Sequence, residues 1–171
     1  MDSADERRIL EALVDHGVDF VVIGATAAIF QGAPIAATLD LDVTAATTKK
    51  NLERLAAALR DLEARLRLPD PDEHVEMPLD ARMLETLSGV TLMTRHGPFD
   101  VLFAPSGSPA YAELKANAVE VAPFGLLVRV ARIEDLVSMK RAAGRAKDAL
   151  HLEVLLNLLE DLKGQRPEGL D

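Results

Sequence analysis

The sequence predicts a single α/β domain with a helical C-terminal end, and three observations support this prediction. The chain has 171 residues, and one domain usually contains roughly 100–200 residues. Apolar residues recur with the period of a helix in some segments and alternate with polar residues in others. No linker or change of composition divides the chain, so we expect one domain over residues 1–163 and a frayed tail over residues 164–171.

The first half of the chain is expected to alternate helices with strands. The predicted elements are a helix from Ser3 to His16, a strand over 19–23, a helix over 25–31, a strand over 39–43 and a helix from Thr47 or Thr48 to about Arg67. Leucines at intervals of three and four residues predict the two long helices, and the continuous apolar run predicts the first strand. The second strand follows from the alternation of apolar with acidic residues.

The second half is expected to contain two hairpins and three helices. The predicted elements are strands over 90–95 and 99–103 around His96-Gly97-Pro98, a helix from Ser108 or Pro109 to about Ala116, strands over 118–122 and 126–131 around Phe124-Gly125, and helices over 133–145 and 147–163. The stretch Pro69-Asp70-Pro71-Asp72 is expected to be a rigid loop, and no element is assigned between 70 and 88.

Composition excludes several classes of function. The chain has no cysteine, which rules out disulfides, thiolate metal sites and a cysteine nucleophile. Its 19 basic and 28 acidic residues leave a net charge of −9, which disfavours broad binding to nucleic acid or anionic lipid. Because the start is charged and no long apolar run is present, we expect a cytoplasmic protein with no secretory signal and no membrane span.

Two aspartates, Asp40 and Asp42, alternate with apolar residues on the predicted strand 39–43. Alternation puts both carboxylates on one face about 6.5–7 Å apart. Two like charges repel there unless a cation neutralises them, so the pair suggests Mg²⁺ or Mn²⁺. The alternative is an exposed edge strand with two solvated aspartates.

Asp100 lies among apolar neighbours on another predicted strand, where a carboxylate needs an explanation. If its strand lies beside the first, three carboxylates converge into a metal site that also holds substrate phosphates. The alternative is an aspartate that pairs with the turn at His96 or with an arginine.

Gly24-Ala25-Thr26 directly follows a buried strand and opens a helix. Such a turn presents unpaired backbone N–H groups, which bind anions. The alternative is an ordinary strand-to-helix turn.

The C-terminal region carries a basic segment in an otherwise acidic chain. The bases between Arg129 and Asp148 are Arg129, Arg132, Lys140, Arg141, Arg145 and Lys147. A helix could direct two or three of them to one point. The alternative is a solvated helix face.

Taken in order, these segments resemble the polymerase-beta-like nucleotidyltransferase superfamily, and most closely the small bacterial AbiEii-type and MenT-type nucleotidyltransferases of toxin–antitoxin systems. The segments that carry the resemblance are Val21–Ala28, Gly32–Asp42, Asn51–Leu55, Gly97–Leu102 and Ala131–Asp148. The last is the most specific, because it combines Glu-Asp-Leu, a lysine and Arg-x-Lys-Asp. The resemblance implies a nucleotidyltransferase fold, with a small mixed sheet flanked by helices and with C-terminal helices.

The resemblance also implies a reaction, in which a nucleoside monophosphate passes from an NTP to an acceptor hydroxyl. Asp40, Asp42 and Asp100 would hold the catalytic Mg²⁺ or Mn²⁺, and Asp100 would also help to deprotonate the hydroxyl. The nucleotide-binding residues would be Gly24, Ala25, Thr26, Lys140, Arg145 and Asp148. For MenT-type relatives the acceptor is the 3′ end of tRNA, and a cognate antitoxin protein would be a partner.

Three features depart from the superfamily pattern. Ala25 stands where Gly or Ser is usual, the stretch Pro34–Ala37 lacks a basic residue found in many relatives, and His151 replaces an acidic or apolar residue. Two alternative functions therefore stay open. One is nucleotidylation of a small cationic molecule or a protein, and the other is a non-catalytic module of this fold that binds a nucleotide or a partner protein.

Overall fold

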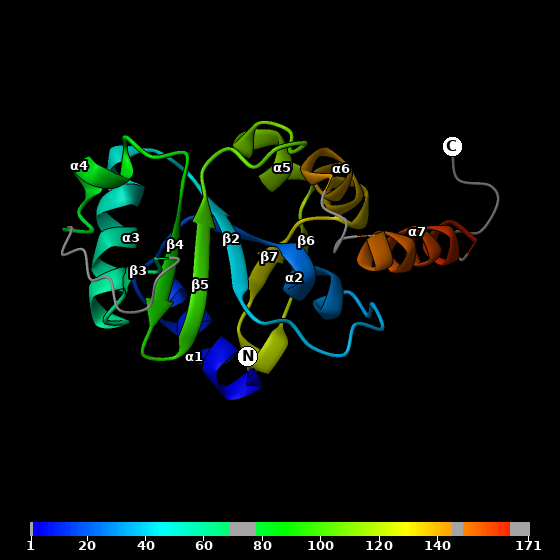
Figure 1. Cartoon of the computed structure of the whole chain (residues 1–171), viewed down its shortest axis with the longest axis horizontal. Helices are drawn as coiled ribbons and strands as arrows, with labels where there is room; N and C mark the ends of the chain where they lie inside the picture. Colours follow the sequence, from blue (N-terminus) through cyan, green and yellow to red (C-terminus); the bar gives the residue numbers. More distant parts are fainter. Residues whose placement is uncertain (1, 69–77, 145–148, 165–171) are drawn as a thin grey trace.

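A computed structural model describes residues 2–68, 78–144 and 149–164 (Figure 1). The helices are α1 (Ser3–Asp15), α2 (Gly24–Phe30), α3 (Lys49–Asp61), α4 (Ala81–Leu84), α5 (Tyr111–Asn117), α6 (Ile133–Ala143) and α7 (Ala149–Gly164), with a 3-10 helix, η1 (Pro123–Gly125). The strands are β1 (Phe20–Ile23), β2 (Leu41–Ala45), β3 (Arg65–Leu66), β4 (Gly89–Thr94), β5 (Gly97–Leu102), β6 (Val119–Val121) and β7 (Val128–Val130).

The described strands form one seven-stranded mixed sheet in the order β3-β4-β5-β2-β1-β7-β6. Strand β2 lies between β5, to which it is parallel, and β1, to which it is antiparallel. The two predicted hairpins are present as β4–β5 and β6–β7. The predicted α/β fold class, with a mixed sheet and C-terminal helices, is therefore confirmed.

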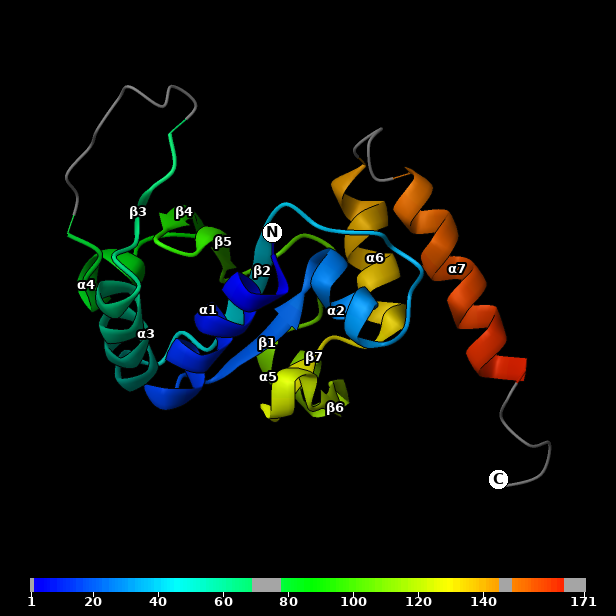
Figure 2. The same ribbon diagram turned by 90° about the horizontal axis from the view of Figure 1, so that it is seen from below.

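Alternation along the central strands separates an apolar face of the sheet from a polar one. On β2, Leu41 and Val43 are fully buried, and so are their partners Phe99 and Val101 on β5. Asp42 lies between the two buried β2 residues, so its side chain faces the opposite side of the sheet. Helices α1 and α3, which lie side by side (Figure 2), add buried leucines to the same core. The apolar face thus fixes the strand register and leaves the polar face for a site.

The predicted long helix to Arg67 is wrong at its end, because α3 stops at Asp61. Leu62 forms the C-cap, and Glu63 adopts a left-handed conformation with φ of 53°. The chain then turns back as β3, which pairs with β4. The turn brings Arg67 to the edge of the central strands instead of to a helix surface.

Other boundaries differ less from the predictions. The strand predicted over 39–43 runs over Leu41–Ala45, so Asp40 precedes it in a bend. The predicted loop at Pro69–Asp72 and the tail beyond Gly164 lie outside the described residues. Within the unassigned segment 70–88, the described part contains α4, whose N-cap Asp80 accepts a hydrogen bond from the Met83 N–H.

The two C-terminal helices pack against each other at one end of the sheet (Figure 1). Only Leu155 of α7 is fully buried, although the helix is rich in leucine. Among the described helices, none is both long enough and apolar enough to cross a membrane.

Asn51 of α3 ties together the start of β1 and the end of β2. Its Oδ1 accepts a hydrogen bond of 2.6 Å from the Asp19 N–H, and its Nδ2 donates to the carbonyls of Asp19 (2.9 Å) and Ala46 (2.8 Å). The side chain is only 3% exposed, so water cannot replace these bonds when they are lost.

We expect Asn51→Ala to lower the free energy of unfolding by about 3 kcal/mol, because each polar group left buried and unpaired costs roughly 1–3 kcal/mol. Urea unfolding followed by circular dichroism measures the change. The control is Asn157→Ala on the exposed surface of α7, which is expected to change stability by less than about 0.5 kcal/mol. Equal effects of the two substitutions would contradict the assigned role of Asn51.

Candidate active site

Three carboxylates meet on the polar face of the sheet. Asp42 on β2 is the direct register partner of Asp100 on the parallel strand β5, and Asp40 lies in the bend that leads into β2. One carboxylate oxygen from each of the three lies within 4.8 Å of the others. The predicted pairing of these strands, and the convergence of their aspartates, is therefore present in the structure.

The carboxylates open into a cavity of about 890 Å³, a volume suited to a small-molecule ligand. The bend before β2, the start of α2, strands β4 and β5, and helices α6 and α7 all contribute to its lining. Leu39, which adjoins Asp40, is 83% exposed at this cavity. The Thr38 hydroxyl donates a hydrogen bond of 2.9 Å to the Asp40 carbonyl and so holds the bend.

Gly24 allows the Asp42 carboxylate to lie directly against the backbone of the β1–α2 turn. Its φ is +69°, and a Cβ built at this position would collide with Asp42 Oδ2. Both the left-handed conformation and the close approach therefore require glycine. The turn and the central carboxylate form one packed unit.

We expect Gly24→Ala to lower the free energy of unfolding by about 3 kcal/mol, since a left-handed alanine costs roughly 1–2 kcal/mol before the collision with Asp42 is added. Gly144→Ala is the matched control, because Gly144 has a φ of +60° and open space where its Cβ would lie. The control is expected to cost only about 1 kcal/mol. Denaturant titration of both variants gives the comparison, and equal costs would exclude the predicted collision.

The environment of Asp42 disfavours its ionised form. Burial, with smaller contributions from Asp40 and Asp100, raises the pKa of Asp42 to about 7, although the nearby charges of Lys140 and Arg67 oppose the shift. Burial likewise raises the pKa of Asp100, against the opposing charge of Arg67. A site that holds carboxylates above their ordinary pKa is suited to bind a cation that restores their ionisation.

Lys140 is the predicted nucleotide-binding base that the described structure brings to the carboxylates. It lines the cavity from α6, and its charge acts on Asp42. Helix α6 is held to the loop after β5, where the Ser138 hydroxyl donates a hydrogen bond of 2.7 Å to the Gly107 carbonyl. The other two predicted residues of this segment, Arg145 and Asp148, lie outside the described residues.

The residues of the predicted anion-binding turn do not all face the cavity. Gly24 and Ala25 line the cavity. The Thr26 side chain is instead 1% exposed, and its hydroxyl donates a hydrogen bond of 2.8 Å to Glu6 of α1. The structure therefore does not bring the Thr26 hydroxyl to the carboxylates, and only the backbone of this residue lies at the helix start.

Sequence reasoning missed Arg67, which follows β3 and contacts the acidic cluster. Its Nη2 lies 2.9 Å and 3.0 Å from the two oxygens of Asp100 and 3.9 Å from Asp40 Oδ2. The alternation in Arg65-Leu66-Arg67-Leu68 was the available signal for a strand. A basic residue thus reaches the site from an element other than the one expected from the superfamily pattern.

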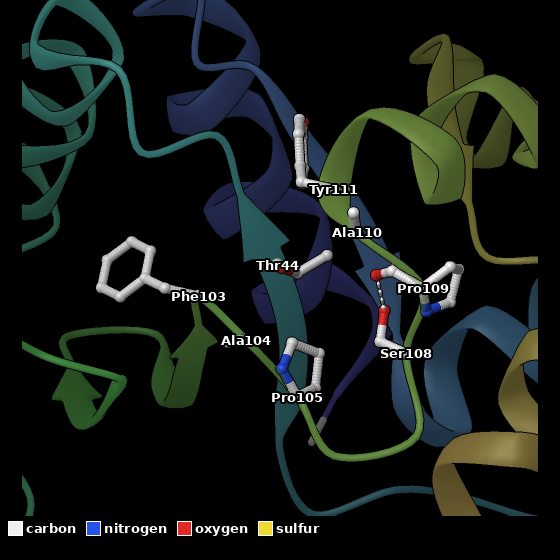
Figure 3. A pocket seen from close by; sticks show the side chains of 8 residues that line it. All are labelled: Thr44, Phe103, Ala104, Pro105, Ser108, Pro109, Ala110 and Tyr111. Carbon is white, nitrogen blue, oxygen red and sulfur yellow. Dashed lines mark hydrogen bonds between the residues drawn. The ribbon is translucent and has the colours of Figure 1, made fainter.

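A second, smaller cavity of about 170 Å³ adjoins the first on the same face of the sheet and shares Ala104 and Pro105 with it. Figure 3 shows its lining side chains, which include Thr44 of β2, Tyr111 of α5 and Ser108, whose hydroxyl donates to the Pro109 carbonyl. Its lining contains no charged side chain. The volume is too small for a nucleotide.

The donor set of the larger cavity fits a divalent cation that prefers oxygen ligands. Asp40, Asp42 and Asp100 offer only carboxylate oxygens, the ligands that Mg²⁺ and Mn²⁺ take in proteins. These three side chains would hold the ion.

No protein-family model matches the sequence, and no curated protein matches it either. Solved structures match it by fold. One of them is TM1012 of Thermotoga maritima, which has been assigned as a nucleotidyltransferase. It matches with a TM-score of 0.55 at 16% identity, over 88% of this chain and 89% of TM1012.

The antibiotic-resistance factor ANT(2″)-Ia matches in two structures. Its solution structure gives a TM-score of 0.61 at 16% identity over 92% of this chain and 83% of that chain. Its crystal structure in complex with adenylyl-2″-tobramycin gives 0.60 at 15% identity over 94% and 91% of the two chains. The protein therefore has the fold of these nucleotidyltransferases, as the resemblance implied.

Proposed function

We propose that the protein is a nucleotidyltransferase that depends on a divalent metal ion and transfers a nucleoside monophosphate from an NTP to an acceptor hydroxyl. The observation that carries this proposal is the convergence of Asp40, Asp42 and Asp100 beside Lys140 in one cavity. The fold supports it, because the cluster lies on the polar face of the central strands of a nucleotidyltransferase fold.

Each residue has a role that follows from its chemistry. Asp40 and Asp42, with Asp100, bind Mg²⁺ or Mn²⁺. Bound by these residues, the ion would lower the pKa of the acceptor hydroxyl and offset the negative charge that develops during the reaction. Lys140 contacts the triphosphate from α6. We propose the same role for Arg145, and we propose that Asp148 orients one of these two bases. The backbone N–H groups of Gly24, Ala25 and Thr26 face the phosphates at the start of α2.

The reaction is an in-line displacement at phosphorus. The acceptor oxygen forms a bond to the α-phosphorus while the bond from that phosphorus to the bridging oxygen of the β-phosphate breaks. The electron pair of the broken bond leaves with pyrophosphate. Asp100 accepts the proton of the attacking hydroxyl, as a general base within the acidic cluster. The protein contributes mainly position and charge stabilisation.

For the acceptor we propose the 3′ end of a tRNA, in the manner of the MenT-type enzymes that the sequence resembles, with a cognate antitoxin protein as partner and the cytoplasm as location. The net charge of −9 disfavours binding along the length of a nucleic acid. Capture of one end needs only local positive charge, and Lys140 supplies it at the cavity.

A small cationic acceptor is the second candidate. The fold match to ANT(2″)-Ia, whose structure holds adenylyl-2″-tobramycin, covers 94% of this chain. An acidic cavity attracts a cation, so an aminoglycoside-like molecule would suit this site.

The deciding experiment incubates the protein with each labelled NTP and Mg²⁺ or Mn²⁺, in separate reactions with total tRNA, with an aminoglycoside and without an acceptor. Label on tRNA supports the leading proposal, and label on the aminoglycoside or on the protein itself replaces it with the corresponding alternative. Nucleotide binding that needs metal but gives no transfer identifies a non-catalytic module. Absence of both transfer and binding that needs metal overturns the proposal.

A further inference from the structure

Arg67 belongs to one row of residues that crosses the sheet to the acidic cluster. Its backbone N–H donates a hydrogen bond of 2.9 Å to the Thr91 carbonyl and so continues the pairing of β3 with β4. Thr91 is the register partner of Asp100 on β5, and Asp100 is the partner of Asp42 on β2. The backbone of Arg67 is therefore fixed in line with the two carboxylates.

The contact between Arg67 and Asp100 differs from the usual pairing of the two groups. Arginine generally meets a carboxylate with two nitrogens, one for each oxygen. Here the single nitrogen Nη2 lies 2.9 Å from Oδ1 and 3.0 Å from Oδ2 of Asp100, and 3.9 Å from Asp40 Oδ2. One positively charged atom thus lies among the oxygens of two carboxylates, which is where a metal cation would be attracted.

The Asp100 oxygens cannot contact the guanidinium of Arg67 and coordinate a divalent ion at the same time without a cost in free energy. Mg²⁺ requires oxygen ligands at about 2.0–2.1 Å in near-octahedral geometry, and both Asp100 oxygens face Nη2. A single positive charge beside a double one is also repelled, most strongly where burial limits screening by water. Only 13% of the Asp100 side chain is exposed.

We propose that Arg67 is the internal counter-ion of this site, which neutralises Asp100 in the metal-free protein and leaves it when a divalent ion binds. Arg67 therefore weakens metal binding and sets the ion concentration at which the site fills. This inference rests on the proposed function in one respect, namely that the three carboxylates bind a divalent ion. It goes beyond that function because it assigns control of metal loading to a residue outside the acidic cluster.

The test measures binding of Mn²⁺ alone to the full chain by the electron paramagnetic resonance signal of the free ion. Arg67→Gln removes the charge but keeps a polar side chain, and we expect it to bind Mn²⁺ at least about five-fold more tightly than the wild type. The matched control is Arg65→Gln, which makes the same charge change on an exposed residue of β3. We expect the control to change the affinity less than about two-fold.

Thermal unfolding gives a second readout that needs no activity. In EDTA, Arg67→Gln should melt at a lower temperature than the wild type, since Asp100 loses its counter-ion. Saturating Mg²⁺ should raise the melting temperature of the variant by more than that of the wild type, because the stabilisation by a ligand grows with the logarithm of its concentration divided by its dissociation constant. A cooperative melting transition of the variant in both conditions shows that it is folded.

The outcomes separate this inference from the proposed function. If the wild type binds Mn²⁺ and Arg67→Gln binds it equally or more weakly, Arg67 is not a competitor and the inference alone fails. If the wild type and both variants bind no Mn²⁺, the metal site fails and takes the inference with it. Tighter binding by Arg67→Gln and not by Arg65→Gln supports the inference, whether or not an acceptor has been identified.

Discussion

Asp42→Asn is expected to reduce nucleotidyl transfer by about a thousand-fold, equivalent to about 4 kcal/mol of transition-state stabilisation. Asp42 is the central carboxylate of the cluster, because it is the register partner of Asp100 and follows Asp40 by two residues. Asparagine keeps the shape of the side chain and removes the charge, so the change isolates the electrostatic role. Transfer of label from NTP, measured at saturating nucleotide, gives the loss in kcat.

The matched control for Asp42→Asn is Glu53→Gln, which removes one negative charge from an exposed position on α3. We expect the control to keep transfer within about two-fold, because an exposed charge is screened by solvent. If Asp42→Asn kept more than about a tenth of the wild-type rate, the catalytic chemistry would have to lie elsewhere in the cavity. Circular dichroism of both variants establishes that any loss is not caused by unfolding.

The carboxylates of the site were accessible to sequence reasoning because each has a local signature. Asp40 and Asp42 break an apolar alternation, and Asp100 does the same on a second strand. The parallel pairing of β2 with β5, which brings Asp42 opposite Asp100, is a contact between distant segments. Periodicity alone does not specify such pairing, and the family resemblance supplied it.

Arg67 escaped prediction for a physical reason that lies in a single turn. Leu62 and Leu66 continue the spacing of three and four residues of the preceding leucines, so periodicity extended α3 through them. The helix ends because Glu63 enters the left-handed region, a conformation that glycine, not glutamate, usually signals. The neighbouring residues then reverse direction and pair with β4. A tertiary pairing therefore overrode the local helical pattern.

For Thr26, in contrast to Arg67, the sequence predicted the correct element. It did not predict the direction of the side chain. The strand, the glycine and the helix all occur near the expected positions. The direction in which a helical side chain points depends on neighbours from other segments, and here the partner is Glu6 of α1. Prediction from sequence was thus successful for backbone features of the turn and did not extend to its hydroxyl.

The stability of the metal-free protein is expected to decrease as pH rises from 5 to 8, and Asp42 is the main cause. The folded-state pKa of Asp42 is raised to about 7 from the ordinary value of 3.8, first by burial and then by Asp40 and Asp100. Between these two values the folded protein holds a proton that the unfolded chain has released. Stability is therefore greatest below the unfolded pKa and falls with increasing pH until the folded pKa is passed.

Above pH 5, the effect of Asp42 on stability is separate from that of carboxylates whose pKa is lowered in the folded protein. Such carboxylates change the stability in the opposite direction, and they do so at lower pH. Although burial acts to raise the pKa of Asp19, hydrogen bonds from Lys115 and Tyr111 outweigh it and lower that pKa. The stabilising contribution of Asp19 is therefore lost only at acid pH, below the ordinary value of its carboxyl. Groups that are the same in the wild type and in an Asp42 variant contribute equally to both, so their effect cancels in the difference.

Asp42→Asn should therefore be more stable than the wild type at pH 8 in EDTA, in spite of its loss of activity. The advantage should grow by about 3 kcal/mol between pH 5 and pH 8, since one pKa unit corresponds to about 1.36 kcal/mol. Urea unfolding at each pH measures it, and Glu53→Gln should follow the wild type. Saturating Mg²⁺ should remove most of the advantage, because the ion stabilises the ionised Asp42 that asparagine lacks. A constant difference between wild type and Asp42→Asn across this range would mean that Asp42 is ionised throughout, and that no cation is needed to hold the cluster together.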